Sequence, residues 1–320
     1  MASERPLISF IIPHKGRETM LRQTLQSIAR QQADAAQIEV ILVTQNPVLE
    51  SDTLPLPAQL QVTTLHRPEQ DTISRLRNLG VQQARGEYLA FLDADVEIAP
   101  DWVASMLAEL NADPTRVLVS AVQRCADDAP PLEKIRTVLS NAVTDADVRF
   151  LPGRNLFLRR STFEAVGGFP EHLVTCEDYY FTDRVHGLGR LYYSSRSHYV
   201  HLGEDKRYDE MYRKEIWRGQ SNLQSIQGRK IPLSELPSFL VPLWIAFFAL
   251  CALISLFLLS IPALLLALGL ALLPVMLYSV RLHRLARGSI AFSHILHFYL
   301  LYFPARIIGT FTGLFRAIPI

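Results

Sequence analysis

The stretch Gly86-Glu87-Tyr88-Leu89-Ala90-Phe91-Leu92-Asp93-Ala94-Asp95 decides the fold of this chain. Its five apolar residues, 88–92, form a run typical of a strand that is buried on both faces. Asp93 and Asp95 follow, and extended backbone points alternate side chains the same way. Two neighbouring carboxylates repel one another unless a cation lies between them, and oxygen ligands favour Mg²⁺ or Mn²⁺. Taken alone, Asp-x-Asp is also common in solvated loops, so its meaning depends on the rest of the chain.

Strands and helices alternate on both sides of this stretch. The apolar pattern predicts strands at 7–12, 38–43 and 60–65, a helix over about 71–85, and another helix that begins at Pro100 and Asp101. This order is typical of an α/β domain with a mainly parallel sheet. Ligands bind beyond the carboxyl ends of the strands in such sheets, and three polar segments follow strands here: 13–17, 44–46 and 93–95.

The following part of the chain is less regular. Residues 124–148 are polar and contain Pro130-Pro131, so we expect a loop with a helix near 131–142. Further elements are a strand at about 154–159, a turn at Gly167-Gly168, a short helix at 179–185 and a strand at 191–193.

The C-terminal part has a different composition. Residues 236–320 contain five Arg, no Lys and no acid, whereas the preceding 235 residues hold 27 bases and 31 acids. Forty-five consecutive residues between Glu235 and Arg281 carry no formal charge. One helix of that length would reach roughly 68 Å, over twice the ~30 Å hydrocarbon core of a bilayer. We therefore expect the segment to fold back at Pro262 and to cross a membrane twice.

The expected spans cover about 239–259 and 262–280. Arg281, Arg284 and Arg287 follow, and the positive-inside rule places this cluster in the cytoplasm. Two crossings return the chain to the side it left, so residues 1–235 would be cytoplasmic too. A third apolar segment, about 290–304, is open to two interpretations, a further span or an interfacial helix. Gly309 and Gly313 have the small-xxx-small spacing of closely packed helices.

Composition also excludes several classes of protein. A net charge of +1 with ordinary aromatic content argues against a disordered chain and against a strongly basic nucleic-acid binder, so no nucleic-acid partner is expected. Cys125, Cys176 and Cys251 are too far apart in sequence for a zinc motif or a disulfide framework. The three thiols are consistent with a reducing compartment.

An ordered set of motifs accompanies the Asp-x-Asp segment. Pro13-His14-Lys15-Gly16-Arg17 follows the first strand, and Arg77-Asn78-x-Gly80 lies on the helix before the triplet. Gly167-Gly168-Phe169-Pro170 and Glu177-Asp178 come after it. With these motifs the chain resembles the family 2 glycosyltransferases, inverting enzymes of the GT-A (Rossmann-like) fold, over roughly residues 6–222. The tail makes it similar to membrane-anchored bacterial-type members. The resemblance implies a catalytic domain at 1–232 and a membrane domain at 233–320.

The resemblance also implies roles for individual residues. Asp95, helped by Asp93, would hold a divalent cation, Mg²⁺ or Mn²⁺, on the diphosphate of a UDP- or GDP-sugar, and His201 would be a further ligand. Asp178 matches the catalytic acidic position that takes the proton from the acceptor hydroxyl, and Glu177 would orient the site. The expected donor-binding residues are Pro13, His14, Lys15, Arg17, Gln45, Arg77, Asn78, Asp93, Arg154 and Asn155. Without the resemblance, Glu177-Asp178 also suits the first turn of a helix, and His201 suits an ordinary half-buried position.

Two departures from the family pattern bear on specificity. Many members end the second strand with paired acids that grip the nucleoside, whereas this chain has Thr44-Gln45-Asn46, so the base stays open. Processive polysaccharide synthases carry Arg-Trp at the end of a further motif, whereas this chain has Ile216-Trp217. We therefore expect transfer of one sugar rather than polymerisation.

The expected protein is thus a glycosyltransferase integral to the inner (plasma) membrane, with a cytoplasmic catalytic domain and a lipid-linked or glycan acceptor. Two alternatives stay open, a processive polysaccharide synthase and a non-catalytic membrane subunit that binds nucleotide sugars. A nucleotidyltransferase is expected to have a Gly-rich phosphate loop after the first strand. Residues 13–17 contain only one Gly, which argues against that class.

Overall fold

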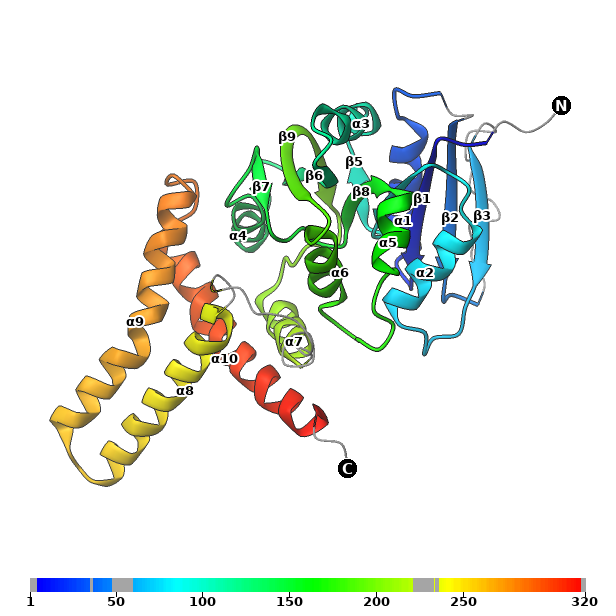
Figure 1. Ribbon diagram of the computed structural model, residues 1–320. Helices are drawn as coiled ribbons and strands as arrows, with labels where there is room; N and C mark the ends of the chain where they lie inside the picture. Colours follow the sequence, from blue (N-terminus) through cyan, green and yellow to red (C-terminus); the bar gives the residue numbers. More distant parts are fainter. Residues whose placement is uncertain (1–4, 35–36, 48–59, 221–232, 234–235, 318–320) are drawn as a thin grey trace. The chain divides into compact units, whose positions relative to one another are not determined.

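The computed structural model describes residues 5–34, 37–47, 60–220, 233 and 236–317 (Figure 1). The chain divides into two compact units. The first comprises Met1–Ala126 and Val143–Glu204, and the second comprises Asp127–Ala142 and Asp205–Ile320. The expected domain boundary at 232/233 falls beside residues outside the described ranges, so the division into 1–232 and 233–320 stays a prediction.

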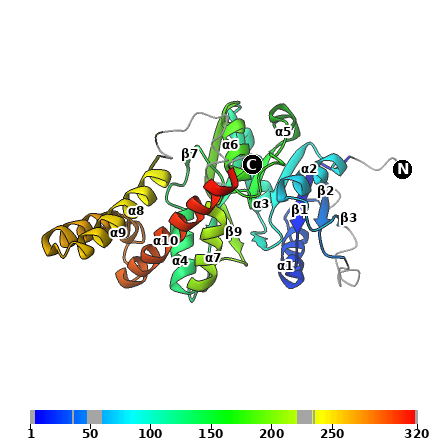
Figure 2. The same cartoon turned by 90° about the horizontal axis from the view of Figure 1, so that it is seen from below.

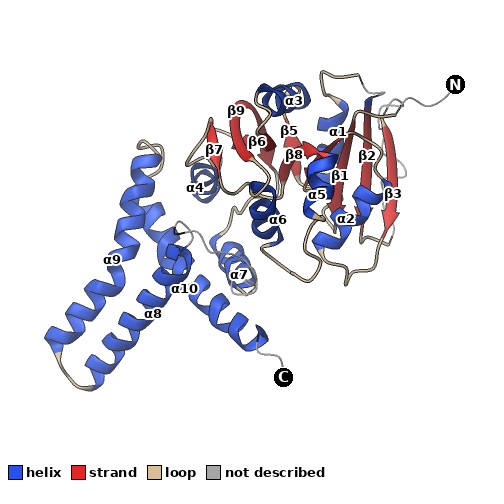
Figure 3. Ribbon diagram, viewed as in Figure 1, coloured by secondary structure: helices blue, strands red, loops and turns tan. Residues whose placement is uncertain are grey.

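The first unit is built on one mixed sheet, whose described strands run in the order β3-β2-β1-β4-β8-β6-β9-β5, with β7 paired to β9 (Figure 3). The strands are β1 (Ile8–His14), β2 (Ile38–Thr44), β3 (Gln61–His66), β4 (Tyr88–Leu92), β5 (Val96–Ile98), β6 (Arg116–Arg124), β7 (Ala146–Val148), β8 (Asn155–Arg159) and β9 (Arg190–His201). The four strands β3, β2, β1 and β4 pair in parallel, as the apolar runs predicted. Beyond β4 the sheet is mixed, because β8 pairs antiparallel with both β4 and β6.

Helices cover both faces of this sheet. On one face, α1 (Glu18–Ala29) and α3 (Trp102–Ala112) pack against side chains such as Phe10 and Ile12 of β1. On the other face, α2 (Ile73–Gln83), α5 (Arg160–Val166) and α6 (Glu177–His186) pack against side chains such as Ile11 and Phe91. Alternate residues of β1 therefore enter different cores, as expected for a strand buried on both sides. The predicted α/β architecture is confirmed.

Four strands differ from the sequence-based expectation. β9 is twelve residues long rather than the predicted 191–193, and it carries the chain to His201. β5, β6 and β7 were not predicted, and β6 lies between β8 and β9. Polar residues such as Ser194, Arg196 and Ser197 interrupt the apolar pattern of β9. Its pairing is set by tertiary neighbours, including a register irregularity against β6, and sequence periodicity does not record this.

The second unit is helical: α4 (Pro131–Ser140), α7 (Tyr208–Gly219), α8 (Leu236–Phe257), α9 (Ile261–Leu285) and α10 (Phe292–Ala317). α8 and α9 lie side by side in Figures 1 and 2, joined by a tight turn at Ser260. The Trp244 indole N–H donates to the Leu270 carbonyl across this hairpin, at 2.9 Å. A shared apolar cluster includes Leu132 of α4, Met211 of α7, Leu282 of α9 and Phe298 of α10.

Two described helices, α8 and α9, are long and apolar enough to cross a membrane, with mean hydropathies of 2.5 and 2.3 over their most apolar windows. They overlap the expected spans at 239–259 and 262–280. Only 17% and 28% of these windows are buried within the protein, whereas the core helix of a soluble protein is mostly buried. Long apolar helices with this much exposed surface are suited to a lipid environment.

Glycines bring α7 and α10 into backbone contact. A Cβ placed on Gly219 would lie 2.9 Å from the Cα of Gly309, and one on Gly309 would overlap the carbonyl oxygen of Ile216. The Gly309/Gly313 spacing noted in the sequence therefore serves helix packing within the second unit.

We expect Gly309→Ala to destabilise the α7–α10 contact by about 1–3 kcal/mol, because the added methyl group has no room. Gly269→Ala in α9 is the matched control, since nothing lies within 4 Å of its Cβ position. Limited proteolysis of the detergent-solubilised chain would measure the difference. Equal protease resistance of the two variants would contradict this account of the contact.

Candidate active site

The site begins at the carboxyl ends of the parallel strands, where the first loop is held by the second. The Asn46 side chain accepts a hydrogen bond from the Gly16 amide at 2.7 Å and donates one to Glu18 at 3.0 Å. His14 is buried at the end of β1, with Nδ1 2.9 Å from the Thr44 hydroxyl. Burial lowers the pKa of His14, so the ring is neutral near pH 7. Neighbouring strand ends therefore fix the loop that contains Lys15 and Arg17.

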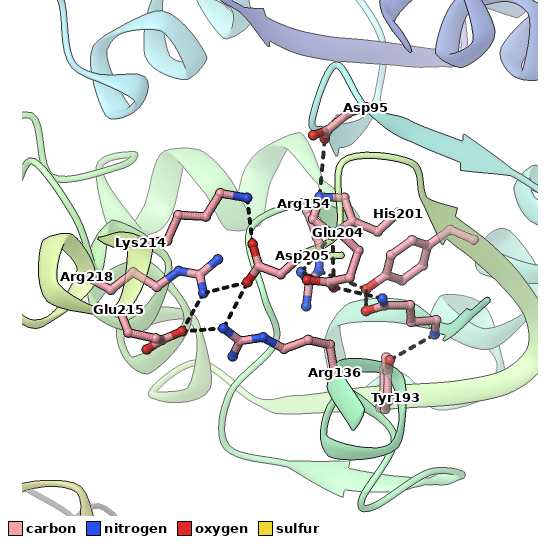
Figure 4. A network of polar contacts seen from close by, with 12 residues as sticks. Asp95, Arg136, Arg154, Tyr193, His201, Glu204, Asp205, Lys214, Glu215 and Arg218 are labelled. Carbon is pink, nitrogen blue, oxygen red and sulfur yellow. Dashed lines mark hydrogen bonds and ion pairs between the residues drawn. The ribbon is translucent and has the colours of Figure 1, made fainter. Parts of the chain in front are cut away.

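Asp95 and His201 face each other at this edge of the sheet (Figure 4). They are brought together by the antiparallel pairing of β5 with β9, which sets Val96 opposite His201. Nε2 of His201 lies 3.4 Å from Oδ1 of Asp95, and its Nδ1 lies 3.1 Å from Oε2 of Glu204. Arg17 donates to the other oxygen of Asp95 at 2.9 Å. The imidazole is thus held between two carboxylates in a largely buried position.

The charges of this cluster shift the pKa values of its members. Burial would raise the pKa of Asp95, but His201, Arg17 and Arg154 lower it below its ordinary value. Burial would lower the pKa of His201, but its hydrogen bonds to Asp95 and Glu204 raise it. Burial would likewise raise the pKa of Glu204, but His201 and Arg154 lower it far more. The carboxylates are therefore kept ionised and acceptor-only, as cation ligands must be.

A second cluster is centred on Arg77, whose side chain is 1% exposed. Its guanidinium donates to Asp93 at 2.9 Å, to Glu177 at 2.9 Å and to the Gly153 carbonyl at 3.3 Å, and it lies 4.9 Å from the centre of the Phe169 ring. Burial would lower the pKa of Arg77, but the charges of Asp93, Glu177 and Asp178 raise it. Arg77 thus joins the strand-end acid to the acids that open α6.

Asp178 lies at the start of α6 with both carboxylate oxygens held by backbone amides. Oδ2 accepts from the Gly153 amide at 3.2 Å, and Oδ1 accepts from the Tyr179 amide at 2.9 Å. Cys176, the residue before the first residue of α6, has a left-handed backbone (φ +62°) that turns the chain into the helix. This placement agrees with the alternative that the two acids serve the first turn of a helix. Asp178 also contacts the Gly153 loop, which connects it to the Arg77 cluster.

The remaining predicted donor-binding residues fall into two groups. Pro13, Lys15 and Arg154 lie at the same edge, Lys15 3.7 Å from Glu69 and Arg154 bonded to the Tyr199 hydroxyl at 3.0 Å. The others are occupied within the fold. Gln45 donates to the carbonyls of residues 68 and 71, Asn78 clamps the backbone of residue 169, and Asn155 is fully buried with Oδ1 accepting from residues 102, 120 and 121. Their amides shape the site, and their roles toward a donor stay predictions.

Sequence reasoning missed Glu204 and Tyr199, which hold His201 and Arg154. Glu204 follows His201 by three residues, a spacing that could have marked it as a partner of the imidazole. Tyr199 precedes His201 by two residues on β9, and its hydroxyl lies next to Arg154, 45 residues earlier. That second contact depends on strand pairing and has no local signal.

Asp95 and His201 are the candidate ligands for a divalent cation. Among the described residues, no three His, Cys, Asp or Glu side chains gather closely enough to hold an ion by themselves. Asp95 and His201 nevertheless suit two of the ligands, because neighbouring ligands around one such ion are about 3 Å apart. The Nδ1 contact with Glu204 leaves Nε2 of His201 for the ion, an arrangement usual for metal-binding histidines. The two residues fit a cation that also takes oxygen ligands from a diphosphate.

The pKa of Glu177 gives a testable pH dependence. Burial and, to a lesser extent, the charge of Asp178 raise the pKa of Glu177 from its ordinary 4.5 to about 7. Arg77 lowers this pKa, but by less than burial and Asp178 raise it. Between pH 4.5 and about pH 7, Glu177 therefore holds a proton in the folded protein that it has lost in the unfolded chain. Because the shift is upward, its contribution to stability is full below about pH 4.5 and is lost as the pH rises through about 7.

We expect the amide-exchange protection of β4 to fall between pH 5 and pH 8 after correction for intrinsic exchange, and Glu177→Gln to reduce that fall. Glu164→Gln on α5, outside both clusters, should leave it unchanged. A fall of the same size in Glu177→Gln as in the parent chain would refute this assignment.

Known proteins share this sequence pattern and this fold. The profile of the family described as Glycosyl transferase family 2 matches residues 9–167. Glycosyltransferase AglE of Haloferax volcanii is 24% identical over 252 residues, which cover 77% of this chain and 82% of AglE. The EpsH protein of Bacillus subtilis is 28% identical over 213 residues, which cover 58% of each chain, so the match spans little more than half of that relative.

A solved structure covers nearly the whole chain. The mannosyltransferase PcManGT of Pyrobaculum calidifontis, solved with GDP-Man and Mn²⁺, is similar with a TM-score of 0.70 over 98% of this chain and 88% of that protein, at 20% sequence identity. At this identity the likeness establishes the GT-A fold. The family profile and the GT-A fold together define a glycosyltransferase. The chain belongs to glycosyl transferase family 2.

Proposed function

We propose that this protein is a membrane-anchored inverting glycosyltransferase, which moves one sugar from a nucleotide-sugar donor to a lipid-linked or membrane-proximal acceptor with the help of a divalent cation. The observation that carries the proposal is the pair of clusters at one sheet edge, Asp95–His201–Glu204 and Asp93–Arg77–Glu177. The first would supply ligands for a cation on a diphosphate, and the second lies against Gly153, whose amide holds Asp178. Family membership and the Mn²⁺ and GDP-Man of the similar mannosyltransferase support this interpretation.

The residues divide the chemistry between them. Asp95 and His201 would hold Mg²⁺ or Mn²⁺, which when bound supplies a Lewis acid that stabilises charge on the leaving nucleoside diphosphate. Arg17, half exposed and beside Asp95, is placed to neutralise phosphate charge. Asp178 accepts the proton from an acceptor hydroxyl as its oxygen attacks the anomeric carbon from the face opposite the leaving group, and the configuration inverts. The Gly153 and Tyr179 amides hold that carboxylate in place, and Arg77 donates to the Gly153 carbonyl.

The membrane part of the proposal rests on α8 and α9. Both are long, apolar and largely exposed in the described structure, and the Arg cluster at 281–287 lies at the C-terminal end of α9. The positive-inside rule then places that cluster and the catalytic domain on the cytoplasmic side of the inner membrane. An acceptor at the bilayer surface is the substrate that such an anchor would bring within reach.

The test is incubation of the detergent-solubilised full chain with a panel of UDP- and GDP-sugars, native membrane lipid, and Mn²⁺ or Mg²⁺. We expect one donor to release its nucleoside diphosphate, EDTA to reduce the release at least tenfold, and the product to carry a single added sugar. Asp95→Asn should need more Mn²⁺ for half-maximal rate, whereas Asp147→Asn on β7 is the control. Absence of release from every donor would favour a non-catalytic nucleotide-sugar-binding subunit, and a polymeric product would favour a processive synthase.

A further inference from the structure

α10 carries a stripe of exposed apolar side chains, Leu300, Pro304, Ile308 and Phe311, spaced by four, four and three residues. This spacing places them on one helix face. Leu300, Ile308 and Phe311 are 45%, 42% and 42% exposed. We call these four residues the α10 stripe. Large side chains in such a row are costly to leave in water, at about 25 cal/mol per Å² of apolar surface.

The opposite face of α10 is fixed to the rest of the second unit. Phe298, Tyr299 and Phe303 lie in the apolar cluster shared with α4, α7 and α9. Gly309 and Gly313 lie against the backbone of α7. The helix is therefore held in one rotation about its axis, and the α10 stripe has to face outward.

The neighbouring helix α7 cannot lie in hydrocarbon. Six of its twelve residues are charged: Asp209, Glu210, Arg213, Lys214, Glu215 and Arg218. Glu215 is 3% exposed, and it pairs with Arg136 and Arg218 at 2.6 Å (Figure 4). It also pairs with Arg306 of α10 at 3.6 Å. Burial would raise the pKa of Glu215, but these three guanidinium groups lower it to about 2. A permanently charged network therefore lies against α10, which excludes a path for α10 through the bilayer core.

The direction of α10 leads to the same conclusion. In Figure 1 it diverges steeply from the α8–α9 hairpin instead of continuing alongside it. Among the described helices, α10 is not one of the two that are long and apolar enough to cross a membrane. If α8 and α9 cross the bilayer, a helix inclined steeply to them, packed on a charged helix and apolar on its outer face, matches the geometry of an interfacial helix.

We propose that α10 lies along the cytoplasmic surface of the lipid bilayer, with the α10 stripe inserted at the boundary between headgroups and acyl chains. The occupant of the stripe is the lipid monolayer that surrounds α8 and α9, because their outward side chains in the same unit are apolar as well. This inference rests on the membrane anchoring in the proposed function and adds a second contact with the membrane. It also selects the interfacial alternative for the apolar segment at 290–304.

The depth of nitroxide labels tests the proposal, because the two geometries differ by a large distance. Leu300 and Phe311 are eleven residues apart, about 16 Å along a helix axis. In a spanning helix the labels would differ in depth by most of that length, whereas in an interfacial helix they would lie at nearly equal depth. Collision rates with O₂ and with a water-soluble nickel complex report the depth in vesicles.

The experiment uses the full chain in phosphatidylethanolamine–phosphatidylglycerol vesicles. Cys125 and Cys251 are replaced by Ser, and Cys176 by Asn, because Asn tolerates the left-handed backbone there. Single cysteines are then placed at 300, 308 and 311 for labelling. Leu250→Cys, 55% exposed on α8, reports a span, and Ser161→Cys, exposed on α5, reports water.

We expect the three α10 labels to lie within a few Å of one shallow depth, with the label at 250 deeper. A depth gradient from 300 to 311 would show a spanning helix and overturn the proposal. Three α10 labels in water beside a deep label at 250 would also overturn it, as would labels shielded from both reagents, which indicate a protein partner or a second copy. A label at 250 in water would instead remove the membrane anchor on which the proposed function depends, and nucleoside diphosphate release in the same vesicles tests catalysis separately.

Discussion

Replacing Asp178 with asparagine is expected to lower kcat by about 10²–10⁴ for an acceptor hydroxyl, because a general base contributes that much. The carboxylate accepts hydrogen bonds from the Gly153 and Tyr179 amides, and an amide of the same shape can keep one of them. The fold and the KM for the donor should therefore change little. Nucleoside diphosphate release at saturating acceptor is the measurement, and Asp147→Asn is the control.

The same variant distinguishes two classes of acceptor. A polyprenyl phosphate is already ionised near neutral pH, so sugar transfer to it needs no base. Asp178→Asn should therefore lower kcat for this acceptor by less than about tenfold. A hydroxyl of a lipid or glycan should show the full loss. Unchanged turnover on a hydroxyl acceptor would exclude Asp178 as the base, whichever acceptor is the natural one.

Arg77→Met is expected to destabilise the first unit by about 3–5 kcal/mol, the cost of removing one partner from a buried ion pair. The guanidinium is 1% exposed and contacts Asp93 and Glu177, so its loss leaves their charges and that of Asp178 close together. Adding Glu177→Gln should recover part of the loss, because one of the buried charges is then removed.

Hydrogen exchange of the β1 and β4 amides measures this change in the intact, detergent-solubilised chain. Arg75→Met is the matched control on the same helix. Arg75 is 48% exposed and pairs with Asp71 at 3.3 Å, and a surface pair of this kind contributes at most about 1 kcal/mol. Equal protection in the two variants would show that Arg77 does not hold the site together.

The sequence predicted those residues of the candidate site that a local pattern marks, and it did not predict contacts that depend on burial by distant segments. Asp93 and Asp95 could be predicted because a continuous apolar run marks the strand before them. Glu177 and Asp178 needed the family resemblance, because acids at a helix start have an ordinary explanation. Arg77 was expected to contact the donor, and that role stays a prediction. The fold buries it between Asp93, 16 residues away, and Glu177, 100 residues away.

The sequence by itself determined the parallel strands β1, β2 and β4, the apolar hairpin α8–α9 and the acidic edge, because each depends on a local pattern of apolar and charged residues. Only the tertiary structure decided that Glu204 holds His201, that Asn155 belongs to the core, and that α10 turns an apolar stripe outward. The physical reason is that pairing of distant strands and contact between helices determine which polar groups are buried together. A local pattern shows how often a residue type recurs. It does not show which distant group will neutralise a buried charged side chain.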